Sequence, residues 1–119
     1  MIKGAERLKL VHAAAAAMDC PLVTVPYKRG VTMLEVEKLV SSYTQGEVSE
    51  LVAIVPGRTD TQWWCKLTGY PACLVTGRLS FDGKSGAPFP SAVFYFGSNL
   101  RKFYENFKHL GLVMIADRQ

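Results

Sequence analysis

Residues 51–64 read LVAIVPGRTDTQWW, and this stretch decides the expected fold. It opens with a continuous apolar run, Leu51 to Val55, which is typical of a strand covered on both faces of a sheet. A proline–glycine pair then interrupts the run, because neither residue type continues a strand well. Thr59 or Asp60 is placed to cap a short helix that extends to Leu67. The stretch therefore predicts a central strand that leads through a turn into a helix.

Upstream of this stretch, helical and strand patterns alternate. Strong helix formers with apolar residues at helical spacing fill Ala5 to Met18. A β-branched run from Leu22 to Val25 predicts a buried strand, and a second helical pattern begins at Thr32 and stops at Gly46. This order places Leu22–Val25 beside the central strand in one sheet.

Downstream, three further runs are predicted as strands, and a helix separates them from a final strand. These elements are strands at Ala72–Val75, Gly77–Phe81 and Ala92–Phe96, a helix from the cap Asn99 to Leu110, and a strand at Leu112–Ala116. The order is α/β throughout, with hairpin-like pairing near the C-terminus. We therefore expect one domain over residues 1–119, a mixed sheet of about five to six strands with helices packed on it.

Composition narrows the class of protein. The chain has 119 residues, of which 49% are hydrophobic and 20% are charged, as in a folded domain rather than a disordered segment. Its net charge of +4 permits contact with nucleic acid or with an acidic protein surface. Cys20, Cys65 and Cys73 contain no CxxC pair, so we expect them to be reduced and buried. The absence of a membrane-length apolar run and of a signal peptide predicts a cytoplasmic protein with no membrane partner.

Three ordered motifs point to one family. They are VPGRTDTQWW at residues 55–64, TGRLSF at 76–81 and APFPSA at 87–92. Together they resemble the phage-type, Dam-like DNA N6-adenine methyltransferases, in which a strand ends in a proline-arginine-threonine-aspartate turn before a tryptophan helix. The resemblance covers Leu51 to Ala116. It implies the C-terminal half of such an enzyme, a truncated Rossmann-like methyltransferase half.

The position that matches the family's catalytic motif is altered. In the family, an Asn/Asp-Pro-Pro-Tyr motif lies one strand and one helix upstream of the turn. Its side-chain oxygen accepts a hydrogen bond from the adenine amine, and its aromatic ring stacks on a base extruded from the duplex. This chain has Thr24, Pro26 and Tyr27 at the matching place. Because a threonine hydroxyl cannot place its oxygen as asparagine does, the resemblance implies a degenerate catalytic site.

The resemblance also implies that the cofactor site is missing. The family places the half that binds S-adenosylmethionine before the catalytic motif, with a glycine-rich turn after its first strand. Gly4 is the only glycine that precedes Pro26 here. We therefore expect no cofactor on this chain alone, and S-adenosylmethionine only if a second chain supplies that half.

Further candidate binding residues lie at predicted strand ends and on the tryptophan helix. Arg58, Asp60 and Arg78 would face DNA or the catalytic cleft in a complete relative, while the alternative is an Arg–Asp ion pair that fixes the turn. Trp63 and Trp64 are adjacent and point to different faces of a helix. We expect one to pack in the core and the other to lie on a partner surface.

Basic residues provide a second group of candidates. Lys28 and Arg29, and the cluster Arg101, Lys102 and Lys108, either follow a nucleic-acid backbone or form an ordinary solvated face. The loop from 81 to 90 is expected to be a flexible hairpin connection, with a phosphate-contacting loop as the alternative, although it matches no P-loop signature. His12 and His109 lack ligand-spaced partners, so neither is expected to bind metal or to act in catalysis.

Two functions remain open. The first is a catalytically incomplete methyltransferase-like protein of phage or mobile-element origin. It would bind DNA or a host defence complex, as an anti-restriction or anti-CRISPR inhibitor in the host cytoplasm. The alternative is a DNA adenine methyltransferase that is active only with a second chain. In addition, an open sheet edge left by the missing half favours a homodimer, since unpaired edges invite strand pairing.

Overall fold

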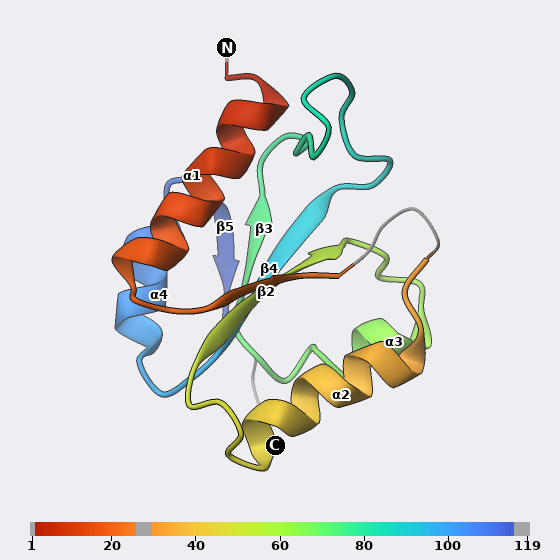
Figure 1. The fold of residues 1–119 in the computed structure, drawn as a ribbon, viewed down its shortest axis with the longest axis vertical. Helices are drawn as coiled ribbons and strands as arrows, with labels where there is room; N and C mark the ends of the chain where they lie inside the picture. Colours follow the sequence, from red (N-terminus) through yellow and green to blue (C-terminus); the bar gives the residue numbers. More distant parts are fainter. Residues whose placement is uncertain (1, 26–29, 116–119) are drawn as a thin grey trace.

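The computed structural model describes residues 2–25 and 30–115, which form four helices and five strands (Figure 1). In chain order these are α1 (Gly4–Ala17), β1 (Leu22–Thr24), α2 (Met33–Thr44), β2 (Leu51–Pro56), α3 (Gln62–Cys65), β3 (Ala72–Val75), β4 (Ser91–Phe96), α4 (Leu100–Phe107) and β5 (Gly111–Met114). The expected α/β class is thus confirmed.

The strands form one mixed sheet in the order β1-β2-β4-β3-β5. Only β1 and β2 pair in parallel among these strands, with Leu22 opposite Val52, and this confirms that the first two predicted strands are neighbours. The remaining pairs are antiparallel. Because β4 runs against both β2 and β3, the strands β1, β2 and β3 all point in the same direction.

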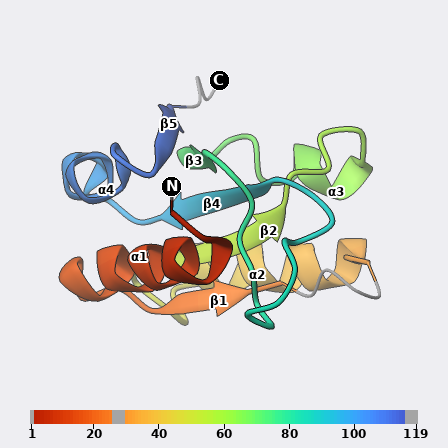
Figure 2. The same cartoon turned by 90° about the horizontal axis from the view of Figure 1, so that it is seen from above.

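Helices cover both faces of the sheet. Figure 2 shows α1 and α4 on one side and α2 and α3 on the other. Along β2, Val52 and Ile54 pack toward α1 and α4, whereas Leu51, Ala53 and Val55 pack toward α2 and α3. Every residue of β2 and β4 is buried, which explains why both strands are continuous apolar runs rather than alternating ones.

Side-chain caps fix where the helices begin. Thr32 and Glu35 form a reciprocal capping box at α2, and Asn99 accepts a hydrogen bond from the Lys102 amide at α4. The expected cap of α3 is wrong: the helix begins after Thr61, not after Thr59 or Asp60. The Thr61 hydroxyl accepts from the Trp64 amide and donates to the Arg58 carbonyl at 2.7 Å.

The predicted strand Gly77–Phe81 is also wrong. Gly77 has a φ of +87°, which turns the chain away from β3, and Leu79 is buried beneath α1 without joining the ladder. A backbone hydrogen bond from the Ala87 amide to the Leu79 carbonyl ties this segment to the chain before β4. The sheet therefore has five strands within the described residues.

Smaller differences concern the ends of two strands and the burial of the cysteines. β1 ends at Thr24 rather than Val25, and β5 ends at Met114, while the predicted end at Ala116 lies outside the described residues. Cys20 and Cys73 are buried as expected, but Cys65 is exposed because it lies on the outer side of α3. No helix in the described part of the chain is long and apolar enough to cross a membrane.

Candidate anion-binding site

One end of the sheet collects the segments that build the site. The strands β1, β2 and β3 all end there, and ligands of open α/β sheets bind at the carboxyl ends of strands. The segment 76–90 leaves β3 at this end and returns to β4. The N-terminus of α1 packs against it so closely that a Cβ on Gly4 would lie 3.0 Å from the carbonyl oxygen of Arg78. Helix and loop thus form one surface.

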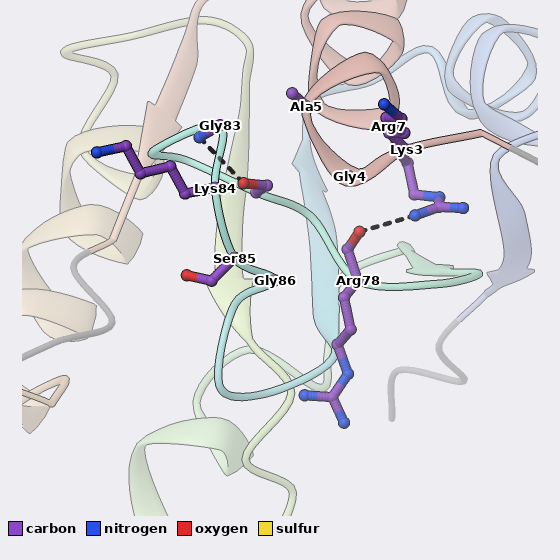
Figure 3. Close-up of a pocket in the computed structure, with 10 residues that line it drawn as sticks. Lys3, Gly4, Ala5, Arg7, Arg78, Gly83, Lys84, Ser85 and Gly86 are labelled. Carbon is purple, nitrogen blue, oxygen red and sulfur yellow. Dashed lines mark hydrogen bonds between the residues drawn. The ribbon is translucent and has the colours of Figure 1, made fainter.

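A pocket of about 360 Å³ lies between α1 and this loop (Figure 3). Its lining comes from the first turns of α1 and from the loop after β3: Lys3, Gly4, Ala5, Arg7, Arg78, Ser80, Gly83, Lys84, Ser85 and Gly86. Four of these side chains are cationic and none is acidic. The side chains that line the pocket therefore carry only positive charge.

Two of the cations hold the walls together. The Arg7 guanidinium donates to the carbonyl of Arg78 at 2.7 Å and to the carbonyl of Ile2 at 3.1 Å. The Arg78 guanidinium points the other way and donates to the carbonyl of Ala87 at 3.2 Å. Figure 3 shows the Arg7 contact crossing from α1 to the loop. These arginines fix the geometry of the pocket while adding positive charge to it.

Asp82 gives the loop a defined shape. Its carboxylate accepts hydrogen bonds from the Lys84 and Ser85 amides at 2.8 and 3.0 Å, and from the hydroxyls of Ser80 and Ser85. These bonds, the Ser85 amide first, lower the pKa of Asp82 to about 2. Asp82, next to the pocket residue Gly83, is therefore ionised and directed at its own loop.

The other two cations are available to a ligand. Lys3 and Lys84 are exposed, and neither amine has a partner among residues 2–25 and 30–115. Figure 3 places Lys84 on the loop side of the pocket and Lys3 on the helix side. α1 also begins at Lys3 without a side-chain cap, so its first amides add partial positive charge. The arrangement suits an extended anion that contacts both sides.

The predicted residues at the β2 end form a turn of their own. Arg58 and Asp60 make a two-point ion pair, with both N···O distances at 3.1 Å, and the guanidinium stacks 4.8 Å from the centre of the Phe89 ring. The hydrogen bond from Arg58 lowers the pKa of Asp60. Neither side chain lines the cationic pocket, whereas Arg78 does.

The two tryptophans lie in different environments, one in the core as expected, while a partner surface for the other stays a prediction. Trp63 is buried between β2, β4 and α2, and Trp64 is half-buried, with its ring centre 5.2 Å from that of Phe94 in an edge-to-face arrangement. Trp64 also lines a second, apolar hollow that involves Leu74 and Met114. Neither ring lies in the cationic pocket.

The remaining candidates are dispersed. Thr24 is exposed at the end of β1, while Pro26, Tyr27, Lys28 and Arg29 lie outside the described residues. On α4, Lys102 binds Glu50 and the Met18 carbonyl, and Lys108 binds Glu105, so these two lysines serve internal contacts. His12 and His109 are exposed, and no group of potential metal ligands occurs in the described part of the chain.

Sequence reasoning missed the helix side of the pocket. It singled out Arg78 and the loop 81–90, which contains Lys84, but not Lys3 or Arg7. One signal was present: helices favour Ser, Thr, Asp or Asn as caps, whereas Lys3 stands at the cap of this helix, and Arg7 follows the acidic Glu6 of its first turn. Comparisons with protein families, curated proteins and solved structures gave no match.

Proposed function

We propose that this chain is a non-catalytic DNA-binding protein that holds the phosphate backbone at the cationic pocket. The observation that carries the proposal is a pocket of about 360 Å³ lined by Lys3, Arg7, Arg78 and Lys84 and by no acidic side chain. Lysines and arginines on such a surface neutralise phosphates and release bound counterions. The net charge of +4 adds a longer-range attraction.

The distribution of the cations favours a polymer over a small anion. Lys3 and Lys84 lie on opposite sides of the pocket, and the two arginines use donors to hold the walls. A single phosphate needs donors that converge on one point, whereas a phosphate backbone passes several cations in succession. Contacts of this kind carry no base information, so we expect binding with little sequence preference.

The resemblance to phage-type adenine methyltransferases supports the same proposal. The segment 76–92 carries two of the three family motifs and also forms the loop wall of the pocket. With Thr24 in place of the family's acceptor, we propose a methyltransferase-like protein that retains DNA contact without methylating it. Acting in the cytoplasm of a host cell, it would compete with restriction or CRISPR complexes for DNA as an anti-defence protein.

Salt-dependent DNA binding tests the proposal. The variant Lys3→Gln/Lys84→Gln removes the two available amines, and the control Lys9→Gln/Lys38→Gln removes two exposed lysines elsewhere on α1 and α2. Both variants lower the net charge equally. Fluorescence anisotropy with a short duplex should show a salt slope reduced by about 2 for the pocket variant, at about 1 per lost phosphate contact. If the salt slope falls equally in both variants, the pocket is not the DNA-binding surface.

One observation favours the two-chain enzyme as a second candidate. Among the described strands, β1 pairs with β2 alone, and Val23 and Thr24 are exposed, so a sheet from another chain has an edge to join. On this hypothesis the second chain supplies the S-adenosylmethionine site. Calorimetric titration of the isolated chain with S-adenosylmethionine should then give no heat. Binding by the isolated chain would contradict both candidates, because each assumes that the cofactor half is missing.

A further inference from the structure

The edge strand β5 exposes an unusual amount of apolar surface. Leu112 is 62% exposed, Met114 is 49% exposed and Ile115, which follows the strand, is 62% exposed. In the ladder with β3, Leu112 lies opposite Leu74 and Met114 lies opposite Ala72. Leu112 and Met114 therefore share the face of the sheet that α2 and α3 cover elsewhere, while Ile115 also lines a hollow beside α4. We call this group, with Leu74, the β5 patch.

Hollows flank this edge on both faces of the sheet. One, of about 200 Å³, is lined by Trp64, Tyr70, Leu74, Phe94, Met114 and Ile115 among others. The other, of about 280 Å³, lies beside α4 and is lined by Leu100, Arg101, Tyr104, Glu105 and Ile115. Figure 2 shows α4 and α3 on opposite sides of the sheet at this end. A strand added to β5 would bring its own side chains into both hollows.

The edge is only four residues long, but it lacks the charges and prolines that protect many exposed strands. Natural edges are kept from pairing by charged residues, prolines, bulges or very short length. β5 reads Gly-Leu-Val-Met with no charge and no proline, and within the described residues it pairs with β3 alone. The opposite edge, β1, has three residues and follows Pro21. β5 is therefore the better candidate for an intermolecular contact.

We propose that a second copy of this chain covers the β5 patch, with the two β5 strands paired antiparallel about a two-fold axis perpendicular to the sheet. Such pairing continues the antiparallel order of β4, β3 and β5 and keeps like faces together. Leu112 then lies beside the partner's Met114 and extends the apolar face across the interface. The two α4 helices come to lie side by side on the other face.

Charge on α4 selects a second copy over a foreign peptide. Arg101 and Glu105 lie one helical turn apart, and both line the hollow beside Ile115. Glu105 also binds Lys108 of its own chain at 2.9 Å, but its side chain is 51% exposed and can still meet a partner. In the proposed dimer, Arg101 lies opposite the partner's Glu105, so the surface complements itself. A peptide of uniform charge would meet a like charge at one of the two positions.

Mass measurement tests the contact. Multi-angle light scattering of the wild-type chain should give twice the chain mass of 13.1 kDa. Leu112→Lys/Met114→Lys should raise the dissociation constant at least about tenfold, which corresponds to about 1.4 kcal/mol. The control Leu34→Lys/Leu10→Lys changes exposed leucines on α2 and α1 and should leave the dimer intact. All of these side chains are more than a third exposed, so circular dichroism should confirm a folded chain in both variants.

A charge swap tests the symmetry. Arg101→Glu alone and Glu105→Arg alone should each weaken the dimer, and the double variant Arg101→Glu/Glu105→Arg should restore it. A wild-type chain that stays monomeric up to its solubility limit would overturn the proposal. A dimer whose dissociation constant is unchanged by the β5 substitutions would also overturn it. If the double variant Arg101→Glu/Glu105→Arg does not regain the wild-type dimer, the two-fold arrangement is wrong. Because Lys3 and Lys84 lie elsewhere, loss of DNA binding and loss of the dimer are distinguishable results.

Discussion

At the residue scale, Gly77 controls how the helix side of the cationic pocket meets its loop. Its φ is +87°, and a Cβ there would lie 2.5 Å from the guanidinium carbon of Arg7. Gly77→Ala should therefore introduce backbone strain of about 1 kcal/mol. It should also displace Arg7 from the carbonyls of Ile2 and Arg78, and each lost hydrogen bond costs about 1 kcal/mol. Urea unfolding should show a loss of stability equal to the strain plus the lost hydrogen bonds. The same variant should bind DNA more weakly.

Gly46 provides a matched control for Gly77. Its φ is +80°, and a Cβ there would meet no atom within 4 Å. Gly46→Ala therefore adds comparable backbone strain without moving Arg7. If both variants lose the same stability and bind DNA alike, the Arg7 contacts do not hold the pocket together.

At the element scale, the attachment of β5 depends on Gly111. This residue lies opposite Val75 in the ladder, and a Cβ on it would overlap the carbonyl of Leu74. The obstacle is backbone, which cannot rotate away as a side chain does. Gly111→Ala should therefore cost about 1–3 kcal/mol, as overpacked sites do.

Amide hydrogen exchange locates the effect of Gly111→Ala. Exchange at Leu112 to Met114 should accelerate, while amides of β2 and β4 should stay protected because those strands are wholly buried. The weakened β5 should also lower dimer formation. Unchanged protection across β5 would mean that the strand shifts register to accommodate the methyl group.

Elements were predictable from sequence where one local signal determined them. The apolar runs of β2 and β4 and the caps Thr32 and Asn99 identified four elements correctly. Gly77–Phe81 was misread because Leu79 is buried by α1 rather than by strand pairing, and periodicity alone does not separate the two causes.

The candidate site was less predictable than the elements. Arg78 stood out because it follows a strand, but Arg7 reaches it across 71 positions of sequence. Such a contact depends on how α1 crosses the sheet, which no local pattern encodes. The same holds for Lys3 and Lys84, which line one pocket only in the folded chain.

At the scale of the whole molecule, a polar network ties the layer of α1 and α4 to the sheet. The Glu50 carboxylate accepts hydrogen bonds from the Tyr95 hydroxyl of β4 and, at 2.9 Å, from the Lys102 amine of α4. Lys102 also donates to the Met18 carbonyl at the end of α1. The network therefore joins one strand and two helices to the residue that precedes β2.

Protonation of Glu50 should loosen this network and make stability depend on pH. Partial burial raises the pKa of Glu50, but the hydrogen bonds from Tyr95 and Lys102 outweigh it, so the net pKa is below the ordinary 4.5. A carboxyl whose pKa is lowered by folding stabilises the native state above its unfolded pKa. That contribution is lost as the pH falls through the lowered folded value. The free energy of unfolding should therefore decline below about pH 4.5, where the unfolded chain binds the proton first.

Glu50→Gln separates this network from other carboxylates. At pH 7 it should cost about 1.5–3 kcal/mol, the range for hydrogen bonds to charged groups, and the deficit should shrink as the wild-type carboxyl becomes protonated. Glu37→Gln removes an exposed carboxylate on α2, away from this network and from the proposed dimer contact, so it should change stability little. Urea unfolding of the three proteins from pH 7 to acid checks both expectations. If the free energies of unfolding of the wild type and of Glu50→Gln differ by the same amount at every pH, the charge of Glu50 does not stabilise the network.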